Sequence, residues 1–366
     1  IINTLMRLQS KSLLFTVTNL SKLLIVLFLT VYLIVFRHSG VKGIYMAQLI
    51  GNGLLVLFVS IYTIRNCRVF FNFPIFKSMS KYGFPIMLAN FAAAALTVID
   101  RYSLNSLALL NYVAIYTLAY KISSVLKLVI VDSIKMALTP LALRKMDSPD
   151  NKRFYSKAFL YSSFVLMTGI IIISLFSFEV IKFITGSREY WESFYLVPLL
   201  SLSVFFINMR ETSSYALIIT KRTKIIGINV VIACVINIVL NLLLIPRWDI
   251  TGAAVATIIT QFIYWLLNFY FSQKELYIPY EVKKIMTLFF TGGLIAFSGL
   301  LMTEIPFFPR FIIKAGCIAG FPFLLYLFNF YEPVELQAIR AFTLKWINIR
   351  NFRKNLQSLK DFKDLE

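Results

Sequence analysis

Long apolar runs alternate with short polar connections along almost the whole chain. Each run is close to the ~20 residues that an α-helix needs to cross a bilayer. The pattern therefore predicts an all-α polytopic membrane protein with ten transmembrane helices. The predicted spans are 13–36, 44–64, 84–102, 113–138, 155–178, 196–218, 225–245, 252–271, 285–302 and 311–331.

One short motif occurs twice and suggests how these helices are grouped. Gly43 and Ala47 open the second span, and Gly252 and Ala256 open the eighth. Small residues four apart share a helix face and allow close helix packing. Six spans separate the copies, so both run in the same direction and predict a parallel repeat of six-helix lobes. The alternative is chance recurrence, because this spacing is common in membrane helices.

The repeat predicts four segments. Residues 1–82 hold the last two spans of an incomplete first lobe, and 83–284 form a complete six-span lobe. Residues 285–331 add two further spans, and 332–366 form a basic cytoplasmic tail. The chain starts with Ile1 and has no signal-peptide pattern, so we expect it to be the N-terminally truncated form of a longer, fourteen-span protein.

Composition and charge support a membrane protein. Hydrophobic residues make up 59% of the chain and charged residues only 15%, which is too apolar for a soluble chain of this length. The net charge of +20 falls mainly on alternate connections and on the tail, with 23 Lys and Arg on one side and six on the other. By the positive-inside rule both ends are cytoplasmic. The basic balance thus reports topology and predicts no nucleic-acid partner.

Ionisable residues inside the predicted spans are the candidate site residues. Span 113–138 contains Lys121, Lys127, Asp132 and Lys135, which would together cost on the order of 10 kcal/mol if they faced lipid. On a regular helix, Asp132 and Lys135 lie within about 40° of Lys121, whereas Lys127 lies about 120° away. We expect these residues to line a translocation cavity that attracts a pyrophosphate or an acidic sugar. Internal pairing, or extension of Lys135 to the membrane surface, is the alternative.

Two further charged pairs lie within or near other spans. Asp100 and Arg101 occupy the outer end of one span, and Arg210 and Glu211 the cytoplasmic half of another. Arg101 and Arg210 join the candidate substrate-binding residues, and Asp132, Asp100 and Glu211 are candidates for ion coupling. Local ion pairing with no contact to a substrate is the competing interpretation.

Several short motifs, in this order, carry a resemblance to a known family. They are Lys81-Tyr-Gly-Phe-Pro85, Ile99-Asp-Arg-Tyr102, Val113-Ala-Ile-Tyr-Thr-Leu-Ala-Tyr-Lys-Ile122, Pro140-Leu-Ala-Leu-Arg144, Glu189-Tyr-Trp191 before Leu196-Val-Pro-Leu-Leu200, and Asp249-Ile-Thr-Gly-Ala-Ala-Val-Ala-Thr257. The chain resembles the polysaccharide-export flippases of the multidrug/oligosaccharidyl-lipid/polysaccharide superfamily, which are O-antigen and capsule repeat-unit translocases. The resemblance covers essentially the whole chain, from the fifth span of the family onward.

The resemblance implies a non-enzymatic flippase of the bacterial cytoplasmic (inner) membrane. It would move an undecaprenyl-pyrophosphate-linked oligosaccharide by alternating access, with no cofactor and no metal. Its partners would be membrane lipids, the lipid-linked oligosaccharide, a polysaccharide polymerase and a chain-length regulator. A multidrug or small-solute exporter is the first alternative, and a membrane glycan polymerase or acyltransferase is the second. His38 is the only histidine, which leaves little for acid–base catalysis.

Overall fold

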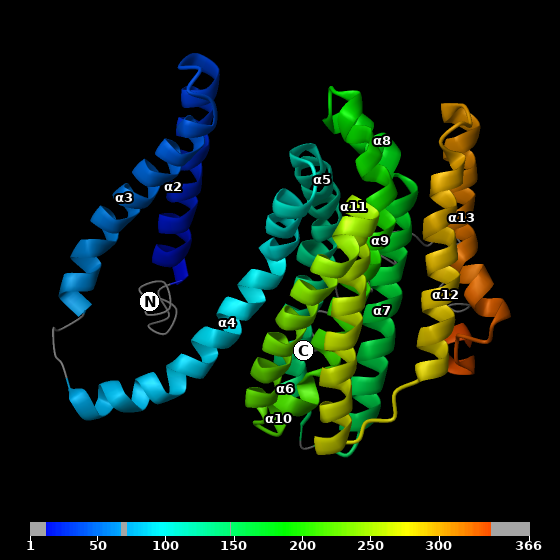
Figure 1. Ribbon diagram of the computed structural model, residues 1–366. Helices are drawn as coiled ribbons and strands as arrows, with labels where there is room; N and C mark the ends of the chain where they lie inside the picture. Colours follow the sequence, from blue (N-terminus) through cyan, green and yellow to red (C-terminus); the bar gives the residue numbers. More distant parts are fainter. Residues whose placement is uncertain (1–11, 67–71, 147, 338–366) are drawn as a thin grey trace, which may run out of the picture. The chain divides into compact units, whose positions relative to one another are not determined.

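The structure is a computed structural model that describes residues 12–66, 72–146 and 148–337 (Figure 1). Within these ranges every regular element is a helix. The predicted basic tail beyond residue 337 and the first 11 residues lie outside the described residues. The chain divides into two compact units, Ile1–Ser80 and Lys81–Glu366, and each is described by itself.

The first unit consists mainly of a pair of long apolar helices. The helix α2 (Ser12–Val31) runs into the π-helical turn η1 (Tyr32–Phe36), and α3 (Gly40–Asn66) returns beside it. Gly43 lies where the two helices meet, since a Cβ there would be 3.1 Å from the Cβ of Leu33. Ala47, one turn later, is completely buried. The first copy of the repeated motif therefore packs α3 against the helix that precedes it.

The second unit contains the remaining helices, and α4 enters it from the first unit. These elements are α4 (Phe73–Leu107), α5 (Leu110–Leu126), η2 (Lys127–Val131), α6 (Asp132–Arg144), α7 (Asn151–Leu175), α8 (Ser177–Ile184), η3 (Arg188–Glu192), α9 (Ser193–Ser213), α10 (Tyr215–Ile219), α11 (Thr223–Glu275), α12 (Val282–Ser298), η4 (Gly299–Met302) and α13 (Phe307–Leu327).

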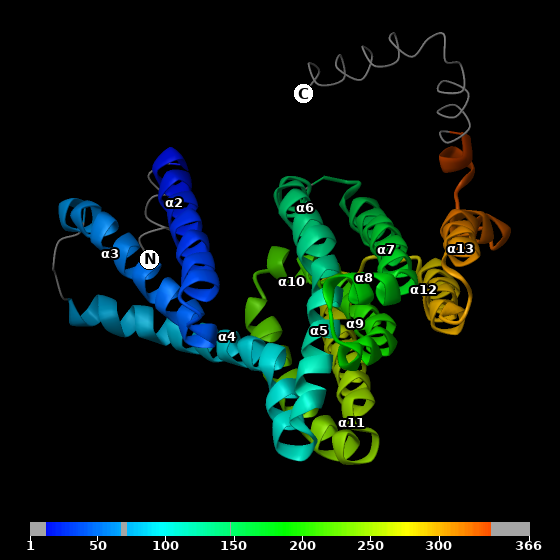
Figure 2. The same ribbon diagram turned by 90° about the horizontal axis from the view of Figure 1, so that it is seen from above.

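The helix α9 forms the centre of this unit. It packs against α5, α7 and α11, and α12 covers the far side of α7, with α13 beside α12 (Figures 1 and 2). Side chains such as Val197 and Phe205 on α9 are completely buried. Many large apolar side chains on the outer helices are exposed instead, as expected for helices whose outer surface faces lipid.

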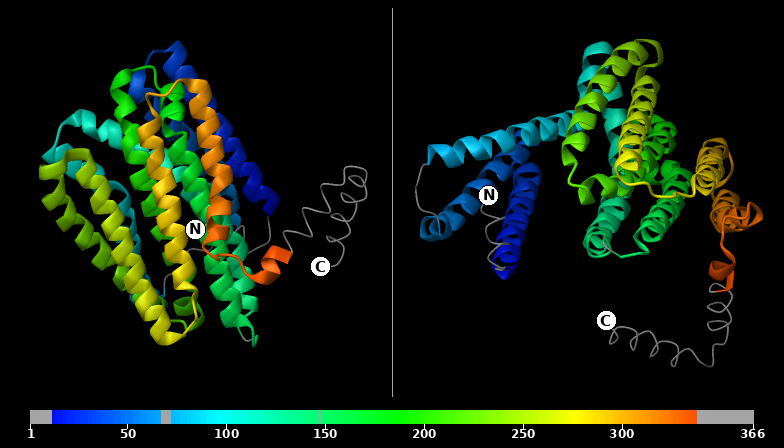
Figure 3. Two further views of the ribbon diagram at one scale, coloured as in Figure 1. Left: turned by 90° about the vertical axis from the view of Figure 1, so that its right-hand side faces the viewer. Right: turned by 90° about the horizontal axis from the view of Figure 1, so that it is seen from below.

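Helix α11 is a hairpin of two helical arms, which Figure 3 shows side by side. Asp249 breaks the helix with φ 47° and ψ −127°. Gly252 follows, and a Cβ there would overlap the backbone of Leu244 on the first arm, so only glycine permits this approach. Ala256 is completely buried one turn later. The second copy of the motif therefore also packs against the preceding helical segment.

A π-bulge joins α5 to α6 in the middle of one long membrane helix. The amide of Asp132 donates to the carbonyl of Lys127 across η2, and neither proline nor glycine occurs in this segment. Gly169 on α7 makes room for it, since a Cβ there would lie 2.6 Å from Cδ1 of Ile130 and 3.0 Å from Cδ2 of Leu126. The bulge adds one residue to a single helical turn and so rotates α6 relative to α5.

The predicted all-α membrane architecture is confirmed. Eight described helices are long and apolar enough to cross a membrane. One of them, α11, holds the two predicted spans 225–245 and 252–271, and α4 contains the predicted span 84–102. Boundaries differ most at α4, which starts within the predicted connection. The connection between spans 155–178 and 196–218 also contains the short helices α8 and η3, which the hydrophobic pattern did not predict.

Ion pairs attach one end of α12 and both ends of α13 to α7 and α8. At the end predicted to be cytoplasmic, Lys157 on α7 contacts Glu281 at 2.7 Å and also pairs with Glu332, which follows α13. Burial acts to raise the pKa of the Glu281 carboxyl, but hydrogen bonds from Lys157 and Lys284 outweigh it and hold that pKa below its usual value. The Glu281 pairs are therefore formed at neutral pH and are lost only as the pH falls through this lowered pKa.

The opposite end of α13 is held by buried charges. Lys314 is only 1% exposed, and its ammonium lies 2.8 Å from both carboxylate oxygens of Glu179 on α8. Arg310 lies 2.9 Å from the same carboxylate and donates to the carbonyl of Thr303. Ionic contacts therefore join both ends of α13 to α7 and α8.

Lys157→Met tests the ionic attachment of α12 and α13. The substitution removes the cation that Glu281, Glu332 and Glu335 share and leaves only Lys284, among the described cations, near them, and we expect the free energy of unfolding to fall by about 1.5–3 kcal/mol. The measurement is thermal melting of the detergent-solubilised protein followed by tryptophan fluorescence. Lys152→Met is the matched control, because Lys152 is exposed on the same helix and forms no ion pair with the described residues. Equal melting of both variants would contradict the attachment.

Gly169→Ala tests the space provided for the π-bulge. The added methyl group must displace Ile130, and overpacking of this kind costs about 1–3 kcal/mol. We expect a lower melting temperature, which Ile130→Val in the same protein should partly restore. Gly316→Ala on α13 is the control, because nothing lies within 4 Å of its added Cβ. A Gly169→Ala protein as stable as this control would show that the bulge does not need the glycine.

Candidate functional site

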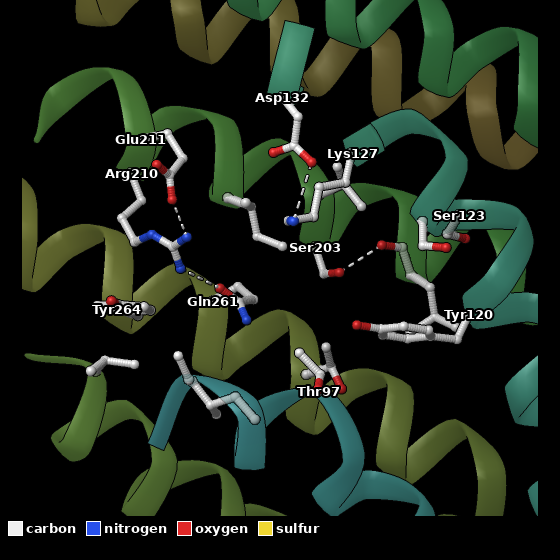
Figure 4. A pocket seen from close by; sticks show the side chains of 18 of the residues that line it. Thr97, Tyr120, Ser123, Lys127, Asp132, Ser203, Arg210, Glu211, Gln261 and Tyr264 are labelled. Atoms are coloured by element: carbon white, nitrogen blue, oxygen red, sulfur yellow. Dashed lines mark hydrogen bonds and ion pairs between the residues drawn. The ribbon is translucent and has the colours of Figure 1, made fainter. Parts of the chain in front are cut away.

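A polar pocket lies inside the second unit, between α4, the α5–η2–α6 helix, α9 and both arms of α11. Its volume is about 290 Å³. Figure 4 shows its labelled side chains converging on one space from these helices. The residues that line it are Ala93, Leu96, Thr97, Tyr120, Ser123, Ser124, Lys127, Asp132, Lys135, Leu200, Ser203, Val204, Ile207, Arg210, Glu211, Val230, Thr257, Gln261 and Tyr264.

Alternating charges occupy one side of the pocket. The ammonium of Lys127 lies 3.5 Å from a carboxylate oxygen of Asp132 across the π-bulge. Lys135 donates to Glu211 on α9 at 2.6 Å, and the other oxygen of Glu211 accepts from Arg210 at 2.5 Å. Three cations and two carboxylates therefore line the pocket, and their net charge is +1.

Arg210 is held in place on more than one side. Its guanidinium lies 4.3 Å from the centre of the Tyr264 ring, which allows a cation–π contact. A second nitrogen lies 3.4 Å from the amide oxygen of Gln261. Both partners belong to the second arm of α11. Arg210 therefore links α9 to α11 within the pocket wall (Figure 4).

A buried carboxylate lies next to the pocket. Asp100 on α4 is 3% exposed and accepts hydrogen bonds from Tyr116 at 2.7 Å, Thr257 at 2.8 Å and Asn241 at 2.8 Å. No Lys or Arg of the described chain forms an ion pair with it. Thr257 lines the pocket as well, so one hydroxyl connects this carboxylate to the pocket wall.

The buried asparagines of α11 extend the polar cluster around Asp100. Asn241 also donates to Asn237 at 3.2 Å, and Asn237 donates to Thr260 on the opposite arm at 3.3 Å. One acceptor of Asn241, its Oδ1, has no hydrogen-bond partner among the described residues. These bonds cross from the first arm of α11 to the second and to α4. They thereby fix the helices that form this side of the pocket.

The structure brings together five of the eight charged residues that the sequence analysis selected. Lys127, Asp132, Lys135, Arg210 and Glu211 all line the pocket. The other three are placed differently. Lys121 is exposed and does not line the pocket. Arg101 lies outside the pocket lining but over the ring of Tyr120, at 4.6 Å from the ring centre. Asp100 is buried behind the pocket wall.

The π-bulge explains why the geometry predicted for the charged span differs. A regular helix puts Lys127 and Asp132 about 140° apart, whereas the structure places them in ionic contact. The regular-helix geometry also predicted that Lys121 lies beside Asp132. That prediction is wrong, because the bulge turns α5 relative to α6.

Neutral polar residues also line the pocket, and the sequence did not lead us to predict them. Thr257, Gln261 and Tyr264 lie on one face of the second arm of α11, and Tyr120 and Ser203 contribute from α5 and α9. The spacing of Thr257, Gln261 and Tyr264 by four and three residues was the available signal, since polar side chains at that spacing share a helix face.

Comparisons with known proteins agree with this architecture. Residues 3–195 match the model of a family described as "Polysaccharide biosynthesis protein". An uncharacterised membrane protein, MJ1068 of Methanocaldococcus jannaschii, is 25% identical over 229 residues, which are 62% of this chain and 45% of the relative. The chain thus spans less than half the length of this curated relative.

A solved structure shows the same fold. The lipid II flippase MurJ in an inward closed conformation superimposes with a TM-score of 0.66 over 85% of this chain and 67% of that chain, at 17% sequence identity. At this identity the likeness concerns the fold alone. Taken with the match over more than half of its length, the chain belongs to the Polysaccharide biosynthesis protein family and is a multi-pass membrane protein with a MurJ-like fold.

Proposed function

We propose that the protein is a translocase that moves a lipid-linked oligosaccharide across the cytoplasmic membrane for surface polysaccharide biosynthesis. The observation that carries this proposal is the polar, charged pocket enclosed by membrane helices. Ionisable side chains at bilayer depth cost about 2.5–3.5 kcal/mol each, and here five of them converge on one space. Membership of a polysaccharide biosynthesis family and the fold of a flippase support a saccharide-bearing lipid as the cargo.

The proposed cycle is alternating access between two six-helix lobes, with no covalent chemistry. The second unit supplies one lobe and the two added helices. The substrate is an undecaprenyl-diphosphate-linked repeat unit, as in O-antigen or capsule export, and the protein acts in a bacterial inner membrane. A polymerase and a chain-length regulator would receive the product on the outer side. Export of drugs or small solutes is the competing function that the following experiment separates, and glycan polymerase or acyltransferase activity is the second alternative.

Lys127→Ala in the full-length protein tests this function. The change leaves Asp132 in the pocket without its cation, and we expect surface-glycan display in living cells to fall at least tenfold while membrane insertion persists. Lys121→Ala is the matched control, because Lys121 lies on the same long helix but outside the pocket. Normal display with Lys127→Ala would remove Lys127 from the proposed site. Normal display in cells that lack the protein altogether, combined with drug sensitivity, would favour an exporter.

Asp100 is the carboxylate that we propose for ion coupling. Asp132 and Glu211 already have cationic partners at 3.5 Å and 2.6 Å, whereas Asp100 has only neutral donors. A coupling cation that reached Asp100 would therefore not have to displace a Lys or Arg of the described chain. Its hydrogen bond with Thr257 connects ion occupancy to the pocket wall.

Asp100→Asn tests the coupling role, because the amide keeps the shape of the side chain but removes its charge. Transport by proteoliposomes should lose its dependence on an imposed proton or sodium gradient. Asp132→Asn is the comparison, and its dependence on the gradient should persist. If Asp100→Asn proteoliposomes respond to the gradient as the wild type does, Asp100 only joins α4 to α5 and α11. Loss of the response in Asp132→Asn alone would assign the coupling role to Asp132 instead.

A further inference from the structure

The serine and threonine hydroxyl groups that line the pocket share one property: each already donates its hydrogen to another group of the protein. Thr97 donates to the carbonyl of Ala94 at 2.7 Å, and Ser203 donates to Leu200 at 2.6 Å. Ser123, Ser124 and Thr257 also donate to groups of the protein. A hydroxyl has one hydrogen and two lone pairs. These oxygens therefore offer acceptors to a ligand, and the ligand must supply the hydrogens.

Each cation of the pocket has a carboxylate partner. Lys127 pairs with Asp132, and both Lys135 and Arg210 pair with Glu211. A diphosphate that entered the pocket would compete with carboxylates that the chain holds permanently beside these cations. It would also meet the negative charges of Asp132 and Glu211 at short range, where repulsion is strong. A lining with a net charge of +1 does not balance the two negative charges of a diphosphate diester.

Besides the remaining ammonium hydrogens of Lys127 and Lys135, the pocket has neutral donors that are unoccupied. The Tyr120 hydroxyl is directed into the pocket (Figure 4) and has no hydrogen-bond partner among the described residues. Gln261 accepts from Arg210 through its oxygen, which leaves its amide hydrogens for a ligand. Many acceptors with a few neutral donors match a sugar ring, whose hydroxyl and amide groups both donate and accept. The volume of about 290 Å³ is at the low end of the ~300–1,000 Å³ typical of ligand pockets.

We infer that this pocket binds one sugar ring of the lipid-linked substrate and that the diphosphate is held outside it. The inference rests on the proposed function and assigns to this pocket the recognition of the saccharide. Tyr120, Thr97 and Ser203 are then residues that determine which glycan is accepted. The charged residues Lys127, Asp132, Lys135, Arg210 and Glu211 form a polar wall beside the sugar, and their ion pairs stay intact when the sugar binds.

Binding by the full-length protein in lipid nanodiscs tests the inference. The probes are undecaprenyl diphosphate without sugar and the same lipid carrying N-acetylglucosamine, glucose or galactose. Each hydrogen bond to the sugar contributes about 3- to 10-fold in affinity. We therefore expect at least one sugar-bearing lipid to bind tenfold or more tightly than the sugar-free lipid. The triple variant Tyr120→Phe, Thr97→Val, Ser203→Ala should lose this preference and bind the sugar-free lipid within twofold of the wild type.

The control is Thr168→Val with Ser163→Ala on α7. These two hydroxyls donate to backbone carbonyls in the same way but do not line the pocket. This control should keep the preference for the sugar. The inference is overturned if the wild type shows no preference for any of the three sugars, or if the triple variant weakens sugar-bearing and sugar-free lipids equally. A wild type that binds and transports none of the lipids overturns the proposed function, and the inference with it.

Discussion

The need to compensate charge inside the bilayer governs the second unit. A buried ion that lacks a partner costs several kcal/mol, and three polar clusters here satisfy this requirement in different ways. Around the pocket, cations and carboxylates alternate between α5–α6 and α9. Around Asp100, neutral donors from α5 and from both arms of α11 replace a cation. At α13, two cations share Glu179. Each solution joins helices that are distant in sequence, so the same contacts that remove the cost of charge also define the fold.

This compensation also shapes the site. A pocket whose cations all have carboxylate partners is polar but has a net charge of only +1. Selectivity then depends on hydrogen-bond geometry from several helices, because acceptors and neutral donors must match a ligand atom by atom. The neighbouring Asp100 cluster shares Thr257 with the pocket wall, so one side chain contacts both the buried carboxylate and the pocket.

The sequence was sufficient for the all-α membrane architecture because hydrophobic length reports membrane helices directly, although it predicted ten spans where eight described helices are long and apolar enough to cross a membrane. It was also sufficient to select five charged residues of the pocket, since ionisable groups within apolar runs are rare. The sequence did not predict how far α6 is rotated relative to α5 about the helix axis. The bulge that causes this rotation has no proline or glycine of its own, and the glycine that accommodates it, Gly169, belongs to another helix. Neutral residues such as Tyr120 and Gln261 were missed because single polar side chains in a span carry little information without their neighbours.

The hairpin of α11 has a consequence for how the chain is made. Its two arms are joined by a sharp turn at Asp249 with hardly any loop, and asparagine and threonine side chains bond from one arm to the other. A ribosome would deliver the arms to the membrane almost simultaneously, and the first arm would expose its buried asparagines to lipid until the second one arrived. Insertion as a preformed pair avoids that exposure. The turn therefore serves biogenesis as much as architecture, and a lengthened connection would burden synthesis of the protein before it affected the finished molecule.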